Sequence, residues 1–454
     1  MQNVQEFLIA AVAFIVLVGL MVVVHEFGHF IVAKLFKIRV EAFSFGFGPR
    51  LFGIKYGETD YKVCLLPLGG FVKMTGENPG ETEHENDPAA FTSHPRWQRM
   101  LVGLAGPVAN FILAFVLMVF YYGFINEEPR HELQTTTVEW VVDGSPASLA
   151  GLQPGDVIRK FDNVDNPSWD QVNQRASINL NQNVALQVDR GGNLVPLSLH
   201  VPDAPKGQDF EFGELGVIPQ FIQGPIGVQE VTPGTPAAQA GVKDGDALVS
   251  VDGHAFHTVI ALLAYLQAGQ GKPVSLVLMR NGATLPPIIA HPAKVDGDEW
   301  KLGFAPTPVP FGADPLPLGK AVVKSKNFCI QNSTLIVEVL GRLFTRQVSV
   351  SQLSGPVGIA RMAGTAAQTK DWLSKFTLAA AISLNLGILN LVPFPILDGG
   401  MIMLLLIESI IRQDISTMVK ERIYQAAFVL IMVFFAFIIF NDVTKLPVFT
   451  HIKP

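Results

Sequence analysis

The chain has 454 residues, of which 49% are hydrophobic and 16% are charged. It is too apolar for an ordinary soluble enzyme and too polar for a bundle made only of membrane helices, so we expect both membrane-spanning and water-exposed parts. The formal net charge of -6 provides no broad basic surface, which argues against nucleic acid as a partner and leaves membrane lipid as the expected surroundings. The two cysteines, Cys64 and Cys329, are expected on opposite sides of the membrane, so no disulfide is predicted.

Four apolar runs are long enough to cross a bilayer, which takes about 20 helical residues. They cover residues 7–33, 100–124, 376–397 and 424–440. The first run lacks a preceding basic segment and exceeds the apolar length of a signal peptide, so we expect it to be retained. Lysine and arginine crowd the segment between the first two runs, which the positive-inside rule therefore places in the cytoplasm, with the N-terminus outside. Lys445 and Lys453 in the C-terminal tail run against that rule.

An internal repeat lies between the second and third runs. The sequence GSPASLAGLQPGDVI at 144–158 recurs as GTPAAQAGVKDGDAL at 234–248, and ELGVIP from Glu214 recurs as KLGFAP from Lys301. These echoes predict two tandem, mostly β units of about 90 residues each. The pattern resembles the PDZ domain over about 127–309, which implies that each unit offers a sheet edge and groove to a peptide or chain end. A role as a spacer or steric lid is the alternative.

The segment 318–347 carries apolar side chains at roughly helical spacing, which predicts an amphipathic helix. Two positions fit such a helix equally well: the outer membrane surface, or the surface of the neighbouring domain.

The first apolar run ends in the motif H-E-x-x-H, formed by His25, Glu26 and His29. Residues four apart share one helix face, so both imidazoles are able to reach one zinc ion while Glu26 faces its open position. We expect Glu26 to take a proton from water and pass it to the departing amine, while zinc polarises the scissile carbonyl. Ionisable side chains inside an apolar run are costly in lipid, which favours a functional site over histidines that merely mark the emergence of the helix.

Hydrolytic zinc usually takes a third protein ligand, for which Asp398 is the strongest candidate. It closes the third apolar run and is the only carboxylate near it. Eighteen residues separate Phe7 from His25, about 27 Å of helix, so the histidines and Asp398 are both expected towards the cytoplasmic side. A simple turn at Asp-Gly-Gly, where the chain leaves the membrane, is the alternative.

Three motifs together resemble the site-two protease family of intramembrane zinc metalloproteases, in its bacterial form: HEFGH, GPVAN at 106–110, and N-x-x-P-x-P-x-L-D-G at 390–399. The resemblance implies Zn²⁺ bound by His25, His29 and Asp398, with Glu26 as the catalytic base. It implies a single-pass substrate of the anti-sigma factor type, trimmed beforehand by another protease, in envelope stress signalling; signal-peptide remnants are further substrates. It also implies a bacterial inner membrane location, with both termini and the PDZ-like domains on the periplasmic side.

Further residues near these motifs are expected to position the substrate. Asn390, Pro393 and Pro395 interrupt helical regularity beside the zinc, and the Asn390 amide is expected to bond an unwound substrate backbone, or otherwise a neighbouring helix. The segment FSFGFGPR and the alternating stretch after it predict a glycine turn and β-strands whose edge holds an extended substrate. GPVAN is expected to allow close helix packing rather than to act in catalysis.

The predicted fold is a multi-pass α-helical membrane protein with four transmembrane helices, a membrane-associated β-hairpin region and two tandem PDZ-like domains. The expected parts are a first transmembrane helix (1–35), a cytoplasmic loop with the hairpin (36–95), a second transmembrane helix (96–124), two PDZ-like domains (127–220 and 221–309), an outer amphipathic helix and loop (315–372), a third transmembrane helix (373–399), a cytoplasmic loop (400–423), a fourth transmembrane helix (424–441) and an outer tail (442–454).

Three other functions compete with this hypothesis. A different membrane zinc peptidase, with a cytosolic site and a glutamate ligand, lacks an obvious second ligand helix, whereas Asp398 lies in a matching run. A membrane-tethered PDZ scaffold with an inactive site would not need the complete set of chemical groups that this chain carries. A zinc transporter is disfavoured because the apolar runs hold a single ionisable cluster.

Overall fold

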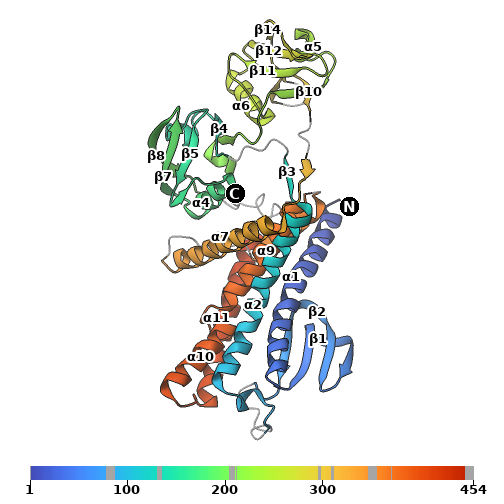
Figure 1. Cartoon of the computed structure of the whole chain (residues 1–454), viewed down its shortest axis with the longest axis vertical. Helices are drawn as coiled ribbons and strands as arrows, with labels where there is room; N and C mark the ends of the chain where they lie inside the picture. Colours follow the sequence, from blue (N-terminus) through green and yellow to red (C-terminus); the bar gives the residue numbers. More distant parts are fainter. Residues whose placement is uncertain are drawn as a thin grey trace. The chain divides into compact units, whose positions relative to one another are not determined.

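The computed structural model shows two compact units, residues 1–127 with 313–454, and residues 128–312. Figure 1 gives the course of the chain. The structure describes residues 2–77, 87–129, 135–203, 210, 212–294, 298–307, 311–345, 355–369 and 371–444. Most of the outer tail expected at 442–454 lies outside these residues.

The four predicted spans are confirmed as helices that are long and apolar enough to cross a membrane. They are α1 (Gln2–Leu35), α2 (Arg96–Phe120, extended by the π-helical turn Tyr121–Ile125), α9 (Trp372–Asn390) and α11 (Thr417–Thr444). Three more helices belong to the same unit: α7 (Leu318–Phe344), α8 (Pro356–Gln368) and α10 (Asp398–Ile411). The expected amphipathic segment thus forms one long helix, α7.

The third span ends earlier than expected. Its predicted range of 373–399 stops at Asn390, residues 391–397 are not helical, and Asp398 begins α10 instead of closing the span. Pro393 and Pro395 explain the break, because proline lacks the N–H that a helix interior needs and disfavours helical conformation in the residue before it. The cytoplasmic loop expected at 400–423 accordingly contains most of α10.

Helix α2 is the centre of the unit formed by residues 1–127 and 313–454, and α1 and α9 pack on it. A side chain on Gly28 of α1 would lie 2.3 Å from the Ala105 carbonyl oxygen, and one on Gly387 of α9 would lie 3.1 Å from the Pro107 carbonyl oxygen. Small residues at these contacts let the helix backbones approach closely. The role in helix packing that the sequence predicts for GPVAN is therefore seen at Pro107.

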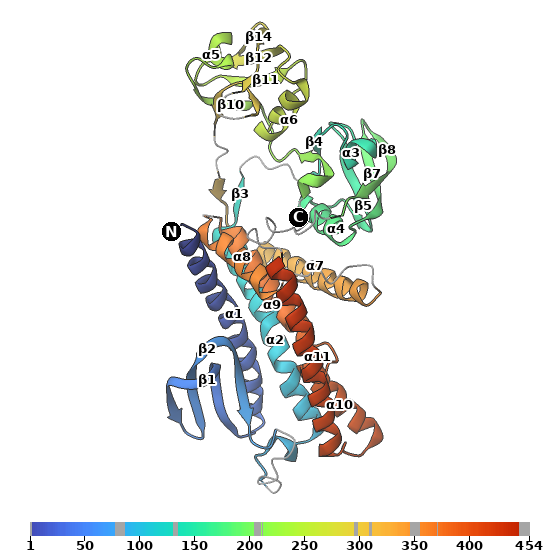
Figure 2. The same ribbon diagram turned by 180° about the vertical axis from the view of Figure 1, so that it is seen from behind.

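Helix α8 packs against the N-terminal part of α1 and the C-terminal part of α11 (Figure 2). A side chain on Gly364 of α8 would lie 2.7 Å from Ala10 of α1. Asp442 of α11 is buried and accepts backbone N–H groups at the start of α8, from Gly355 at 3.0 Å and Val357 at 3.0 Å. A carboxylate at a helix N-terminus satisfies otherwise unpaired donors and complements the helix dipole.

The segment expected to be a hairpin forms a sheet from two long strands, β1 (Val40–Tyr56) and β2 (Thr59–Met74). Each strand folds back on itself, so the first part of β1 pairs on one side with residues 60–63 and on the other with residues 70–74 of β2. Residues 70–74 are therefore an edge of this sheet. The edge lies against α1, since a side chain on Gly70 would come within 3.3 Å of Glu26 Cγ.

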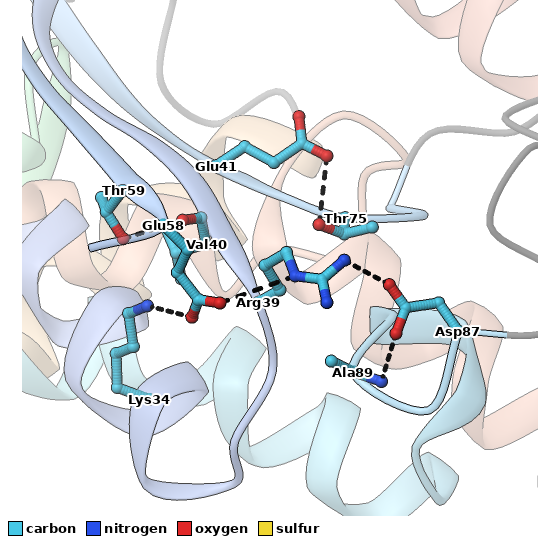
Figure 3. A network of polar contacts seen from close by, with 9 residues as sticks. All are labelled: Lys34, Arg39, Val40, Glu41, Glu58, Thr59, Thr75, Asp87 and Ala89. Carbon is cyan, nitrogen blue, oxygen red and sulfur yellow. Dashed lines mark hydrogen bonds and ion pairs between the residues drawn. The ribbon is translucent and has the colours of Figure 1, made fainter. Parts of the chain in front are cut away.

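Polar contacts fix the base of this sheet to the end of α1 (Figure 3). The Glu58 carboxylate accepts Lys34 Nζ at 2.7 Å and lies 3.5 Å from Arg39 Nε. Arg39 also pairs with Asp87 in the following loop. These contacts tie the turn between β1 and β2, and the loop at Asp87, to the end of α1.

The second unit holds two domains with matching element orders. The first contains β4 (Val138–Val141), α3 (Pro146–Leu149), β5 (Val157–Phe161), β6 (Val164–Asp165), α4 (Trp169–Ile178), β7 (Gln182–Arg190), β8 (Asn193–Val201), a 3₁₀ turn (Phe212–Leu215) and β9 (Val217–Pro219). The second contains β10 (Ile226–Val231), α5 (Pro236–Ala240), β11 (Ala247–Val251), α6 (Val259–Gly269), β12 (Val274–Arg280), β13 (Ala283–Thr284), β14 (Ile288–Ala290), β15 (Ala293–Lys294), β16 (Trp300–Lys301) and β17 (Phe304–Pro306). The short strands β3 (Glu127–Pro129) and β18 (Phe311–Ala313) pair with each other.

The repeated sequence folds alike in both copies. Asp156 in the first copy is buried, accepts Gln153 N at 2.9 Å and pairs with Arg190 at 2.7 Å. Asp246 in the second copy is also buried, accepts Lys243 N at 2.8 Å and pairs with Arg280 at 2.6 Å. Each copy also has its own hydrophobic core. The arginine pairing lowers the pKa of the Asp246 carboxyl, as expected for a carboxylate beside a guanidinium.

Candidate metal centre

His25 and His29 lie one turn apart on α1, and both are buried. Their Nε2 atoms are 3.2 Å apart. The other ring nitrogen of His29, Nδ1, lies 2.7 Å from the Val102 carbonyl oxygen on α2, which can only accept a hydrogen bond. His29 Nδ1 therefore carries the proton, and its Nε2 lone pair is directed at the neighbouring imidazole.

Asp398 joins the two histidines from the start of α10. Its Oδ2 lies 3.1 Å from His25 Nε2 and 3.5 Å from His29 Nε2, and no donor among the described residues makes a hydrogen bond to that buried oxygen. The two glycines after it are required by packing. A side chain on Gly399 would lie 2.3 Å from the Leu391 carbonyl oxygen, and one on Gly400 would lie 2.0 Å from the Phe394 carbonyl oxygen. The Asp-Gly-Gly sequence thus folds the loop tightly against α10 and carries Asp398 to the histidines.

The three ligand atoms have the spacing of a zinc site. Ligand atoms about 2.0–2.1 Å from a tetrahedral zinc lie about 3.3 Å from one another. The three separations here are 3.1, 3.2 and 3.5 Å. Helix α2 leaves room for them because residue 106 is glycine: a side chain there would lie 2.3 Å from His29 Nε2 and 2.8 Å from His25 Nε2. Two imidazoles and one carboxylate, with an orphaned carboxylate oxygen, fit zinc with an open position.

Glu26 lies beside this trio, between α1 and the edge of the sheet. Its carboxylate lies near the backbone N–H of Val72, and its Cγ lies against Gly70. The carboxylate is therefore oriented by the sheet without being one of the three clustered ligands, which leaves it available as a base.

The residues predicted to position the substrate fall into two groups. Asn390 lies at the site, with its Nδ2 3.5 Å from His25 Nε2. Pro393 and Pro395 lie in the non-helical loop between α9 and α10, the loop that delivers Asp398. Among the described residues no polar contact links either proline to the trio, so their visible effect is on the path of the backbone.

Asn110 is a site residue that sequence reasoning missed, since GPVAN was assigned to packing alone. It is fully buried, and its terminal amide lies 3.1 Å from His25 Nδ1. With Nε2 facing the metal position, a neutral His25 carries its proton on Nδ1 and must donate it. We therefore assign the Asn110 amide oxygen to this contact. The polar side chain within an apolar helix was the available signal.

This contact predicts the effect of Asn110 on metal affinity. Asn110→Leu is expected to weaken zinc binding about 10- to 100-fold, because partners of a ligating histidine fix its tautomer and orientation. Asn110→Asp keeps an acceptor and is expected to retain more metal. Competition of the purified protein against a zinc chelator measures both. Ser383→Ala is the control, since Ser383 Oγ donates to the Asn110 backbone oxygen at 2.9 Å and not to the histidine. Equal zinc affinity in wild type and Asn110→Leu contradicts the assignment.

Comparison with known proteins identifies the family to which the chain belongs. The sequence model of peptidase family M50 matches residues 13–434, a range that includes every residue of the site. The chain belongs to peptidase family M50. Its relatives include the regulator of sigma-E protease RseP of Salmonella typhimurium, 32% identical over 452 residues that cover 96% of this chain and 98% of the relative. The Escherichia coli protein of that name is 32% identical over 97% of this chain and 100% of its own length, and protease RseP of Yersinia pestis is 32% identical over 96% and 98%.

Membership in M50 confirms that the chain is a zinc metalloprotease and that the sequence motifs were correctly assigned to the site-two protease family. It rules out the two competing functions that belong to other families, a zinc transporter and a zinc peptidase of another type. The range that the M50 model matches contains the cluster of His25, His29 and Asp398 that the fold brings together.

Proposed function

We propose that the chain hydrolyses peptide bonds within the membrane-spanning segment of single-pass proteins. His25, His29 and Asp398 bind the zinc in this proposal, and Glu26 is the catalytic base. The observation that carries it is the convergence of three ligand atoms within 3.5 Å of one another, two from α1, which is long enough to span a bilayer, and one from the start of α10.

The depth of the site supports cleavage inside the membrane. Helix α1 extends ten residues beyond His25, from 25 to its end at Leu35, which is about 15 Å of helix. The hydrocarbon core of a bilayer is about 30 Å thick. A site at that depth meets a peptide bond of a spanning segment more readily than one of a soluble protein.

The zinc, Glu26 and Asn390 have separate roles in the proposed reaction. Zinc supplies polarisation of the scissile carbonyl and activation of water for attack. Glu26 takes a proton from the attacking water as the new carbon–oxygen bond forms, and delivers it to the nitrogen as the carbon–nitrogen bond breaks. Asn390, close to His25, has an amide with which to hold the substrate backbone in place.

The sheet edge at residues 70–74 offers the substrate a pairing partner. A segment must lose helical hydrogen bonds to be cut, and unpaired backbone groups are costly in lipid. An exposed strand edge satisfies them by adding the substrate as a further strand. The edge lies beside Glu26, so pairing there brings the substrate backbone to the base.

The relatives' names support the proposed substrate class. Regulation of sigma-E by a membrane protease favours a membrane-anchored anti-sigma factor as the substrate, cut after trimming by another protease. In this proposal the inner membrane holds the four spans, with both termini and the two PDZ-like domains in the periplasm. The duplicated β domains then select trimmed substrates, by binding a chain end or by excluding bulky outer domains.

The proposed topology predicts which side of the membrane each unit faces. Cys64 is buried and therefore reports nothing about its side, so exposed positions are needed. In cells stripped of their outer membrane, with Cys64 and Cys329 replaced by alanine, an impermeant thiol reagent is expected to label Leu194→Cys and to spare Tyr56→Cys until the inner membrane is opened. Leu194 is 60% exposed and Tyr56 is 77% exposed. Labelling of Tyr56→Cys in intact cells contradicts the topology.

Purified enzyme in liposomes, with a single-pass anti-sigma factor segment, tests the function. Cleavage is expected to stop when a chelator removes zinc and to return when zinc is added back. An inactive scaffold would cut no segment, either with zinc or without it. A zinc-loaded enzyme that leaves several such segments intact therefore contradicts the proposal.

A further inference from the structure

The edge of β2 beside the site, residues 70–74, presents three outward-facing backbone donors. Thr75 N–H points into the sheet, where it donates to the Arg39 carbonyl oxygen at 3.0 Å. Successive N–H groups of a strand point to opposite edges, so the N–H groups of Gly70, Val72 and Met74 point outward. No other strand among the described residues pairs with this edge.

Carboxylates lie at two of these outward donors. Met74 N–H donates to Glu77 Oε2 at 3.2 Å, and the Glu26 carboxylate lies near Val72 N–H. Glu77 reaches back because the chain turns after Met74 through Gly76, whose φ is +69°, and Glu77 N–H closes the turn on the Met74 carbonyl oxygen at 3.4 Å. Glu77 is also close enough to interact electrostatically with Glu26, His29 and Asp398.

We propose that Glu77 closes the substrate-pairing edge when no substrate is bound, and that an extended substrate segment must displace its carboxylate from Met74 N–H. This inference rests on the proposed function. A substrate strand that adds to the edge needs the outward donors for its own carbonyl oxygens. Its pairing with Val72 also frees Glu26 to face the water it activates.

Closure by Glu77 protects the strand edge from pairing with other chains. An unpaired strand edge is a template for any other chain, and proteins protect such edges with charged side chains. A carboxylate that occupies the donor until substrate arrives provides that protection at a cost in substrate affinity. Glu77 therefore sets KM by competition and takes no part in bond breaking.

Three variants separate this role from its alternatives. Glu77→Ala removes the acceptor, whereas Glu77→Gln removes the charge and keeps an oxygen for Met74 N–H. Glu41→Ala is the matched control. Glu41 accepts Thr75 Oγ1 at 3.0 Å (Figure 3) and pairs with Lys73 Nζ at 2.8 Å, at the same end of the sheet, and neither contact involves an outward donor. Kinetics use the full-length zinc enzyme in liposomes with a single-pass segment.

Glu77→Ala is expected to lower KM about fivefold or more with kcat within about twofold, since a hydrogen bond to a charged group is worth about tenfold in binding. Glu77→Gln and Glu41→Ala are expected to keep KM within about twofold of wild type. An unchanged or raised KM in Glu77→Ala overturns the inference and leaves Glu77 as a turn stabiliser. If Glu77→Ala and Glu77→Gln lower KM equally, the inference also fails. The change in KM would then come from the lost charge and not from the lost acceptor of Met74 N–H.

A binding measurement keeps this result separate from the proposed function. The dissociation constant of a fluorescent single-pass segment is compared in Glu26→Gln and in the double variant Glu26→Gln with Glu77→Ala. Tighter binding by about fivefold or more in the double variant supports the closed edge even where no cleavage is seen. If wild type cuts the segment but the two constants are equal, the inference fails and the proposed function stands.

Discussion

Glu26→Gln is expected to abolish cleavage of a single-pass segment while leaving zinc bound. The substitution removes the base, and general base catalysis contributes about 10²- to 10⁴-fold to rate. Glutamine has the size and shape of glutamate and keeps the packing against Gly70, so the sheet edge and the metal trio are expected to keep their geometry. Product formation by the purified variant, together with its zinc content, measures both effects.

Glu421→Gln is a suitable control for Glu26→Gln. Glu421 is an exposed acid on α11 whose contact is with Gln425, one turn away at 3.1 Å, so the loss of its charge is expected to leave cleavage unchanged. A Glu26→Gln enzyme that cuts at near wild-type rate contradicts the assignment of the base.

Asp398→Asn is expected to weaken zinc binding by at least about 100-fold and to stop cleavage. A change in the partner of a ligand already costs about 10- to 100-fold in metal affinity, and a neutral amide is a poor replacement for the carboxylate itself. Asp398→Glu is expected to keep some metal with reduced rate, because a misplacement of about 1 Å can cost on the order of 100-fold. Metal analysis and chelator competition are the measurements.

The alternative for Asp398 is a purely structural role at the start of α10. Asparagine serves as well as aspartate at turns and helix starts, so that role predicts normal zinc and cleavage in Asp398→Asn. The structure favours the metal role, because Oδ2 of Asp398 faces both imidazoles and accepts no hydrogen bond. Normal zinc content in Asp398→Asn would require another third ligand.

The local part of the site was predictable from sequence because helical spacing alone brings His25 and His29 to one face. Asp398 was also found, since it is the lone carboxylate near a matching apolar run. The end of the third span at Asn390 was not predicted, although Pro393 and Pro395 were noted. Apolar composition continues through the break, and hydropathy does not register the lost helix.

The features that were not predicted depend on contacts between segments that are far apart in the sequence. Asn110 reaches His25 across 85 residues of sequence, and Asp442 reaches Gly355 across 87. Neither partner is marked by a local pattern. Glu77 was missed for another reason: it matters only because the strand before it is an edge, and edge position follows from how β1 and β2 fold back on each other.

The central claim, zinc-dependent cleavage inside the membrane, is tested most directly by locating the scissile bond. A single-pass substrate with polar reporter segments on both sides is cut by the purified enzyme in liposomes, and mass spectrometry identifies the new ends. The proposal predicts one principal cut within the apolar segment, lost in Glu26→Gln. A cut confined to the polar flanks, or one that persists in Glu26→Gln, would contradict it.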